Sequence, residues 1–223
     1  YGTDFLPRED RDIANVIQTR LEALGIRLVF NAQVEEITDE NDQTTVGYLD
    51  RSSGDHVTLP ADAVLIATGR KASTAELDLE AAGVKMNERG EIIVNELLQT
   101  NVPHIWALGD VKGGLQFTYI SLDDSRIIKD QLWGDGKRTA TNRGPIPYSM
   151  FLDPVFARVG LNETEALQAG HKIKVAKIAE AASPRARLFG STSGYLKAIV
   201  DADSNKILGA AFFCNNAYEI INI

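Results

Sequence analysis

Residues 104–133 read HIWALGDVKGGLQFTYISLDDSRIIKDQLW, and this stretch decides the fold class. The apolar run at 104–108 predicts a buried strand, which ends in Gly109 and Asp110. Glycines follow at 113 and 114, and apolar residues then recur at helical spacing over 117–132. A strand, a glycine-rich turn and a helix therefore follow one another, as they do in α/β proteins.

The residues at this turn have the chemistry to bind a ligand. In open α/β proteins ligands bind at the carboxyl edge of the sheet, where the carboxylate of Asp110 can accept hydrogen bonds from sugar hydroxyls. The helix that follows begins with unpaired backbone N–H groups and a positive dipole end, which favours negative charge on a ring or phosphate. Local pattern leaves open the simpler interpretation that Asp110 only shapes the turn.

Residues 1–103 supply earlier elements of the same α/β arrangement. Apolar residues at helical spacing predict a helix over 13–24, which Gly25 ends. Turn-rich stretches at 39–43 and 51–55 separate short strands of hairpin type. The apolar run at 64–67 predicts a strand buried on both faces, a short helix is expected over 75–82, and a strand over 92–94.

Residues beyond 134 predict a second, smaller domain of the α+β class. The stretch 134–147 has the composition of a linker, with Lys137, Arg138 and Arg143 interpreted as solvated. Asn162 and Glu165 form a capping-box pattern at the start of a helix. Strands are expected over 173–178, 195–201 and 206–213, the last two as a hairpin.

Composition excludes several classes of protein. The chain has 223 residues, 44% of them hydrophobic, and a formal net charge of −8, which disfavours nucleic acid and membrane surfaces as partners. The single cysteine, Cys214, excludes an internal disulfide and predicts a cytoplasmic protein. The three histidines lack the spacing of metal ligands, so no metal site is expected.

Three motifs together resemble the flavin-dependent pyridine nucleotide-disulfide oxidoreductases. They are VLIATGR at 64–70, NERG at 87–90 and TNVPHIWALGD at 100–110, in this order. Within that family, FLPREDRD at 5–12 and GGLQFTYISLDD at 113–124 are most similar to the branch that reduces Cu(II) in resistance to reactive chlorine.

The resemblance implies a fold, a set of domains and a binding site. The fold is α/β, with partial Rossmann-like segments for FAD and NAD(P) followed by a partial α+β dimerisation domain. Residues 1–69 would be the rear of the NAD(P)-binding domain, 70–133 the returning segment of the FAD domain, 134–147 a linker and 148–223 the front of the dimerisation domain. The cofactor-binding residues carried over are Gly69, Gly109, Asp110, Gln116, Phe117 and Thr118. Asp110 would bind the ribityl chain of FAD, residues 116–118 the pyrimidine edge of the flavin, and Gly69 the nicotinamide nucleotide.

The resemblance also implies an activity. The complete protein would be a homodimer that passes electrons from NAD(P)H through FAD and a cysteine pair to an acceptor, which could be Cu(II), dihydrolipoamide, another disulfide or mercuric ion. The glycine-rich fingerprints, the cysteine pair and the family's His-Pro are absent from these residues, so we expect a piece of a longer protein that is inactive alone. The alternative of another class is a non-catalytic module for assembly or dimerisation.

Overall fold

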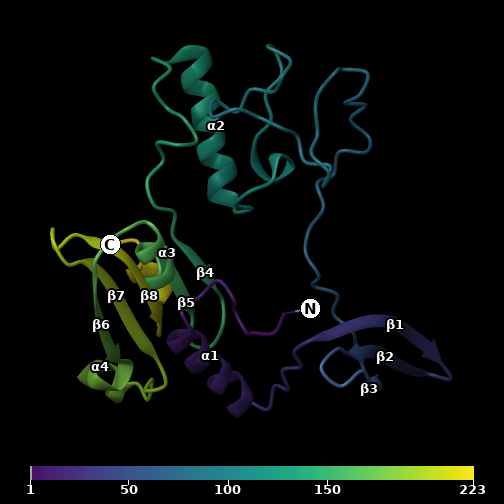
Figure 1. The fold of residues 1–223 in the computed structure, drawn as a ribbon, viewed down its shortest axis with the longest axis vertical. Coiled ribbons are helices and arrows are strands. Elements are labelled where there is room, and N and C mark those ends of the chain that lie inside the picture. The colour runs from purple at the N-terminus through teal and green to yellow at the C-terminus, as the bar shows by residue number, and fades with distance from the viewer. Residues whose placement is uncertain (1) are drawn as a thin grey trace. The chain divides into compact units, whose positions relative to one another are not determined.

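The computed structural model describes residues 2–223 (Figure 1), and the chain divides into two compact units. One unit combines the residues up to Leu65 with Pro145–Ile223, and the other is Ile66–Gly144. The C-terminal segment from Pro145 onward thus packs with the N-terminal segment, and Ile66–Gly144 forms the other unit between them in the sequence. In the residues that the structure describes, no helix is both long enough and apolar enough to cross a membrane.

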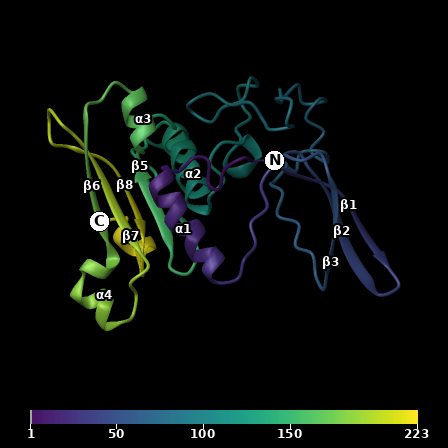
Figure 2. The same ribbon diagram turned by 60° about the horizontal axis from the view of Figure 1, so that its bottom comes forward.

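The first helix, α1 (Arg11–Ala23), confirms the helix predicted over 13–24. Its spacing of apolar residues places Ile13 and Ile17 on one face, and both are fully buried. Gly25 then adopts a φ of +86°, a conformation that L side chains rarely adopt, just beyond the helix. The buried face packs on strand β8 (Ile207–Phe213) and joins a core formed with Phe156 and Phe213. Figure 2 shows α1 lying alongside the C-terminal strands.

A five-stranded antiparallel sheet forms most of the C-terminal part. Its order is β4-β5-β8-β7-β6, and the strands are β4 (Tyr148–Met150), β5 (Phe156–Gly160), β6 (Ile173–Ala179), β7 (Tyr195–Asp201) and β8 (Ile207–Phe213). The pairing of β7 with β8 confirms the predicted hairpin, and Asn205 in its turn has a φ of +58°.

Short helices connect these strands: α3 (Glu163–Gln168), η2 (Glu180–Ala182), α4 (Pro184–Leu188) and α5 (Ala217–Ile220). The predicted capping box at the start of α3 is present, with the Asn162 side chain accepting from the Glu165 backbone and the Glu165 side chain accepting from the Asn162 backbone. The C-terminal part is therefore an α+β structure, as the sequence predicts.

A separate three-stranded antiparallel sheet contains β1 (Ala32–Glu40), β2 (Gln43–Asp50) and β3 (His56–Ala61). Asn41 and Asp42 join β1 to β2, and both have positive φ, which Asn and Asp tolerate better than other non-glycine residues. The two predicted turn regions thus lie where hairpins form.

The unit Ile66–Gly144 contains the helix α2 (Thr118–Trp133) and the short 3-10 helix η1 (Gly109–Lys112). The helix confirms the expectation for 117–132. Val84, Ile92 and Ala107 form the core of the unit. The helix expected over 75–82 forms only turns, and residues 92–94 and 104–108 contribute only the isolated bridges Met86–Ile92 and Gln99–Trp106.

The predicted strand at 64–67 is wrong for this structure. Leu65 is 90% exposed and Ile66 is 69% exposed, and neither pairs with a strand in the described residues. A parallel strand that is buried on both faces requires neighbouring strands and covering helices, and a run of apolar side chains does not supply them by itself. The pattern correctly marks residues suited to burial, but the described chain does not bury them.

Candidate functional site

The Gly109–Asp110 turn is held tightly against α2. Gly109 is buried and has a φ of +69°, which favours glycine. A Cβ placed at Gly109 would lie 2.7 Å from Oγ of Ser121, on the first turns of α2. The sequence therefore needs glycine here for two reasons, the backbone conformation and the close approach of a helix.

A buried carboxylate fixes the same turn from the helix side. Asp124 has no exposed side-chain surface, and its Oδ2 accepts a hydrogen bond of 2.9 Å from the backbone N–H of Gly109. Lys112 Nζ lies 3.3 Å from that oxygen, and Arg143 Nη2 lies 2.6 Å from Oδ1. Asp124 thus connects α2 to the turn through the hydrogen bond that it accepts from Gly109.

The prediction that the basic residues at 134–147 are solvated is wrong for Arg143. Its side chain is mostly buried and contacts both Asp124 and Asp123, and Arg138 donates to Asp123 at 2.8 Å. The connecting segment lacks helices and strands, as predicted, but two of its three basic side chains neutralise carboxylates of α2.

Asp110, in contrast, presents its carboxylate outward. Its side chain is 53% exposed, and Oδ2 lies 3.8 Å from Nη1 of Arg70. The same Nη1 donates to the backbone carbonyl of Gln116 at 3.2 Å. The structure thus brings together two of the predicted site residues, Asp110 and Gln116, through an arginine that the sequence analysis did not assign to the site.

The predicted residues 116–118 lead directly into α2. Phe117 is the N-cap residue, its own side chain makes no capping hydrogen bond, and no acidic residue occupies the first turn of the helix. No carboxylate of the first turn therefore offsets the partial positive charge of this helix end. The ring of Phe117 stacks on that of Tyr119 with centroids 5.2 Å apart.

Gly69 lies at the edge of this group. It is exposed, its φ is +115°, and a Cβ built there would meet no described atom within 4 Å. Its backbone conformation favours glycine, but its neighbour Arg70 makes the contacts with Asp110 and Gln116.

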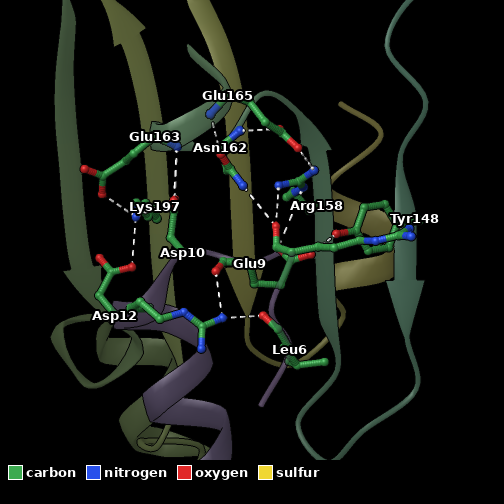
Figure 3. Close-up of polar contacts among 12 residues, drawn as sticks. Leu6, Glu9, Asp10, Asp12, Tyr148, Arg158, Asn162, Glu163, Glu165 and Lys197 are labelled. Atoms are coloured by element: carbon green, nitrogen blue, oxygen red, sulfur yellow. Dashed lines mark hydrogen bonds and ion pairs between the residues drawn. The ribbon is translucent and has the colours of Figure 1, made fainter. Parts of the chain in front are cut away.

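A second polar group, which we call the Lys197 cluster, lies in the other unit and was missed at the sequence level (Figure 3). It consists of Lys197, Lys177, Asp10, Asp12 and Glu163. Lys197 has no exposed side-chain surface, and its Nζ contacts Asp10 at 2.6 Å, Asp12 at 2.9 Å and Glu163. The carboxylates of this cluster have the proximity of metal ligands, but an ammonium group already supplies the positive charge.

The Lys197 cluster joins α1 to two other elements. Asp10 precedes α1, and its carboxylate accepts from the backbone N–H of Glu163 at the start of α3. Lys197 lies on β7, so one ammonium group connects the beginning of α1, the beginning of α3 and the sheet. Glu9, beside it, accepts from the hydroxyl of Tyr148, and Arg158 lies between Glu9 and Glu165 (Figure 3).

Sequence patterns do not reveal the Lys197 cluster or the contact of Arg143 with Asp124, because the partners are far apart in the sequence. Lys197 and Asp12 are 185 positions apart, and Arg143 and Asp124 are 19 positions apart. The signal that could have found the Lys197 cluster is the acidic motif at 9–12, since three carboxylates in such a short stretch require cations if they are buried.

The only cysteine in the sequence lies in a nonpolar environment. Cys214 is 4% exposed and packs with Ala157, Ala217 and Ile221. Burial, with a smaller contribution from Glu180, raises the pKa of its thiol to about 11. Near neutral pH it is therefore a protonated thiol and not a thiolate nucleophile.

Comparison with known proteins agrees with the motifs. The family model described as pyridine nucleotide-disulphide oxidoreductase matches residues 1–125, and the model of that family's dimerisation domain matches residues 146–223. The chain is 48% identical to the "Probable pyridine nucleotide-disulfide oxidoreductase RclA" of Escherichia coli (strain K12) over 98% of its own length and 48% of that protein. It is 35% identical to a mercuric reductase of Staphylococcus aureus over 95% of its own length and 38% of that enzyme.

A solved structure gives the same result in three dimensions. The Cu(II) complex of the HOCl-induced flavoprotein disulfide reductase RclA from Escherichia coli matches with a TM-score of 0.92 and 47% identity, over 99% of this chain and 49% of that one. The chain thus spans about half the length, or less, of these relatives. The matched models together confirm partial Rossmann-like segments followed by a partial α+β dimerisation domain, and the chain belongs to the pyridine nucleotide-disulphide oxidoreductase family.

Proposed function

We propose that this chain is the C-terminal part of an FAD-dependent NAD(P)H oxidoreductase and forms part of its flavin site. The observation that carries the proposal is that the Gly109–Asp110 turn and the N-terminus of α2, whose first turn holds no acidic residue, lie in one compact unit. Family membership and the similarity to a flavoprotein disulfide reductase support it. Residues 1–69 and 70–133 would belong to the NAD(P) and FAD domains, and 148–223 to the dimerisation domain.

The residues present fit a flavin nucleotide. Asp110 offers an exposed carboxylate as an acceptor for hydroxyl groups, and α2 offers a positive helix end with no acidic residue in its first turn for negative charge on a ring. A flavin has both features, a polyhydroxyl chain and a ring that becomes anionic on reduction. We therefore assign Gly109 and Asp110 to the ribityl chain and Gln116, Phe117 and Thr118 to the pyrimidine edge.

Each assigned residue has a role in binding or orientation. When bound, FAD would supply the redox chemistry by accepting a hydride from NAD(P)H and passing electrons onward. Asp110 would accept hydrogen bonds, and Gly109 would allow the turn to lie close to α2. Arg70, which contacts Asp110 and the carbonyl of Gln116, would keep the two halves of the site together. Gly69 is proposed to border the nicotinamide nucleotide.

Partners and acceptor are further parts of the proposal. The match of residues 146–223 to a dimerisation domain supports a homodimer. The similarity to RclA, of which a Cu(II) complex is solved, favours Cu(II) as the electron acceptor and a role in oxidative or reactive-chlorine stress resistance. Mercuric ion, dihydrolipoamide and other disulfides are the alternative acceptors. The single cysteine favours a cytoplasmic location.

The test is flavin retention by the complete gene product. Asp110→Ala should lower the flavin content after extensive dialysis and weaken rebinding of FAD by the apoprotein. Glu76→Ala is the matched control, because it removes an exposed carboxylate from the same unit. Equal flavin content in both variants would remove the role assigned to Asp110.

The same experiment separates the enzyme from a module that only assembles. A complete gene product that dimerises but neither contains flavin nor gains flavin absorbance on addition of FAD would contradict the proposal and support the non-catalytic alternative. A flavoprotein that oxidises NAD(P)H would then be assayed with Cu(II), mercuric ion and a lipoamide disulfide in parallel, which identifies the acceptor.

A further inference from the structure

We propose that Asp124 is a positioning residue of the flavin site, because its buried carboxylate holds the Gly109–Asp110 turn in the orientation that presents Asp110 to the ligand. The inference rests on the proposed function, since it concerns the same ligand. It adds a residue that lies behind the turn and does not itself line the ligand site.

The contacts of Asp124 converge on the turn. Oδ2 accepts from the Gly109 N–H at 2.9 Å and lies 3.3 Å from Nζ of Lys112, at the end of η1. Arg143 Nη2 lies 2.6 Å from Oδ1. Both oxygens are thus occupied, and the carboxylate contacts the first and the last residue of the four-residue segment that contains Asp110.

Two contacts from α2 restrain the peptide of Gly109. Gly109 has a positive φ, and Ser121, one helical turn before Asp124, occupies the space that a Cβ on Gly109 would need. Shape complementarity at Ser121 and the hydrogen bond at Asp124 therefore restrain the same peptide. Asp110 follows immediately, so the direction of its side chain depends on that restraint.

Stability alone does not account for a charged group at this position. Well-packed nonpolar residues of similar volume commonly stabilise a protein as well as a buried ion pair does. A nonpolar residue at 124 would leave the Gly109 N–H without its partner and the turn without an orienting contact. A carboxylate can accept from the N–H and both cations at once, and the arrangement around Gly109 uses each of these contacts.

The neighbouring residue supplies a matched control. Asp123 lies on the same helix, receives 2.8 Å and 3.5 Å contacts from Arg138 and Arg143, and is also mostly buried. The backbone N–H of Gly109 donates its hydrogen bond to Asp124. Asp123→Ala therefore removes one carboxylate and one contact of Arg143 without touching the turn.

The experiment compares Asp124→Ala, Asp124→Asn and Asp123→Ala in the complete gene product. We expect Asp124→Ala to weaken FAD binding by on the order of tenfold, since a hydrogen bond to a charged group is lost from beneath the site. Asp124→Asn keeps one acceptor oxygen and should lie between Ala and the natural residue. Asp123→Ala should change the dissociation constant less than about threefold.

A second readout needs no flavin. Amide hydrogen exchange of the flavin-free complete gene product should show faster exchange at Gly109 in Asp124→Ala and unchanged exchange there in Asp123→Ala. Ile127→Ala, which removes a buried side chain of α2, controls for general loss of stability. If Asp124→Ala does not fold, the comparison of Asp124→Asn with an Asp123→Asn variant takes its place.

Three outcomes would overturn the inference. They are equal FAD affinities in the Asp124 and Asp123 variants, unchanged exchange at Gly109 in Asp124→Ala, and an equal loss of affinity in an Ile127→Ala variant of equal stability. Asp110→Ala separates this failure from that of the proposed function. If Asp110→Ala weakens FAD binding and Asp124→Ala does not, only the role of Asp124 is rejected. If neither variant affects FAD, the assigned flavin site is rejected as well.

Discussion

Lys197 Nζ lies 2.9 Å from Oδ1 of Asp12, a residue 185 positions earlier in the chain. The ammonium group is fully buried and also contacts Asp10 and Glu163. The contact therefore joins the helix α1 to the sheet of the dimerisation-domain segment by charge as well as by the nonpolar packing of Ile13 and Ile17. Segments matched by two different family models are in this way parts of one compact unit.

Replacing Lys197 should destabilise that unit strongly. Lys197→Met keeps most of the side-chain volume but removes the buried ammonium group. Lys177 is then the lysine that still contacts Asp12 and Glu163. Removing one partner of a buried ion cluster typically costs about 3–5 kcal/mol. The free energy of unfolding, measured in urea, should fall by that amount. Lys172→Met, at an exposed ion pair, is the control, and a loss below about 1 kcal/mol for Lys197→Met would show that the cluster contributes little.

The same cluster predicts a loss of stability in acid. Burial opposes ionisation of Asp12, but hydrogen bonds from Lys177 and Lys197 outweigh it and lower the pKa of Asp12. The hydrogen bond from Lys197 is the main cause of the lowered pKa of Glu163. Because both carboxyl groups have lower pKa values folded than unfolded, their contribution is present above the unfolded values and is lost as pH falls through the folded ones.

The urea midpoint should therefore be nearly constant from about pH 6 to 8 and fall below about pH 4.5, where unfolded carboxyl groups begin to take up protons. Glu163→Gln should reduce stability at pH 7. It should also make the fall of the urea midpoint in acid less steep, because one of the carboxyl groups with a lowered pKa is gone. If the urea midpoint of the variant falls in acid as steeply as that of the natural protein, other carboxylates dominate the loss of stability.

Local sequence signals predicted the elements that depend on neighbouring residues. The spacing of Ile13 and Ile17, the Asn162–Glu165 pair and the turn at Asn205 each correspond to the structure. The strand at 64–67 failed because a buried strand depends on neighbours elsewhere in the fold. Arg143 was misassigned because its partners lie on a helix that precedes it, and a side chain's burial is not visible in a polar, aperiodic stretch.

Motifs named the residues of the candidate site, and their role in binding stays a prediction. Asp110 and Gln116 are brought together through Arg70, which the sequence offered only as the end of a motif. Nothing in the local pattern distinguishes Asp124 from Asp123, since they are adjacent acidic residues of one helix. Only the packing of α2 against the turn makes one of them fully buried and leaves the other partly exposed.

Cys214 should react slowly with thiol reagents. Its thiol is buried and its pKa is raised to about 11, so the reactive thiolate is a small fraction at pH 7.5. Reaction with a disulfide reagent in the folded chain should be at least about a hundredfold slower than in 8 M urea, where both effects vanish. A rate in native buffer close to the unfolded rate would contradict the buried position. The control is urea-unfolded Cys214→Ser, which should not react.

Gly109→Ala should disrupt the candidate site through two separable effects. Alanine at a φ of +69° is strained by about 1–2 kcal/mol, and its Cβ would lie 2.7 Å from Oγ of Ser121. Ser121→Gly in the same chain removes the clash but not the backbone strain. The double variant should therefore recover part, but not all, of the stability that Gly109→Ala loses, as measured by thermal unfolding. Full recovery would mean that the positive φ costs nothing, and no recovery would mean that the close approach of α2 to the turn is not what requires glycine.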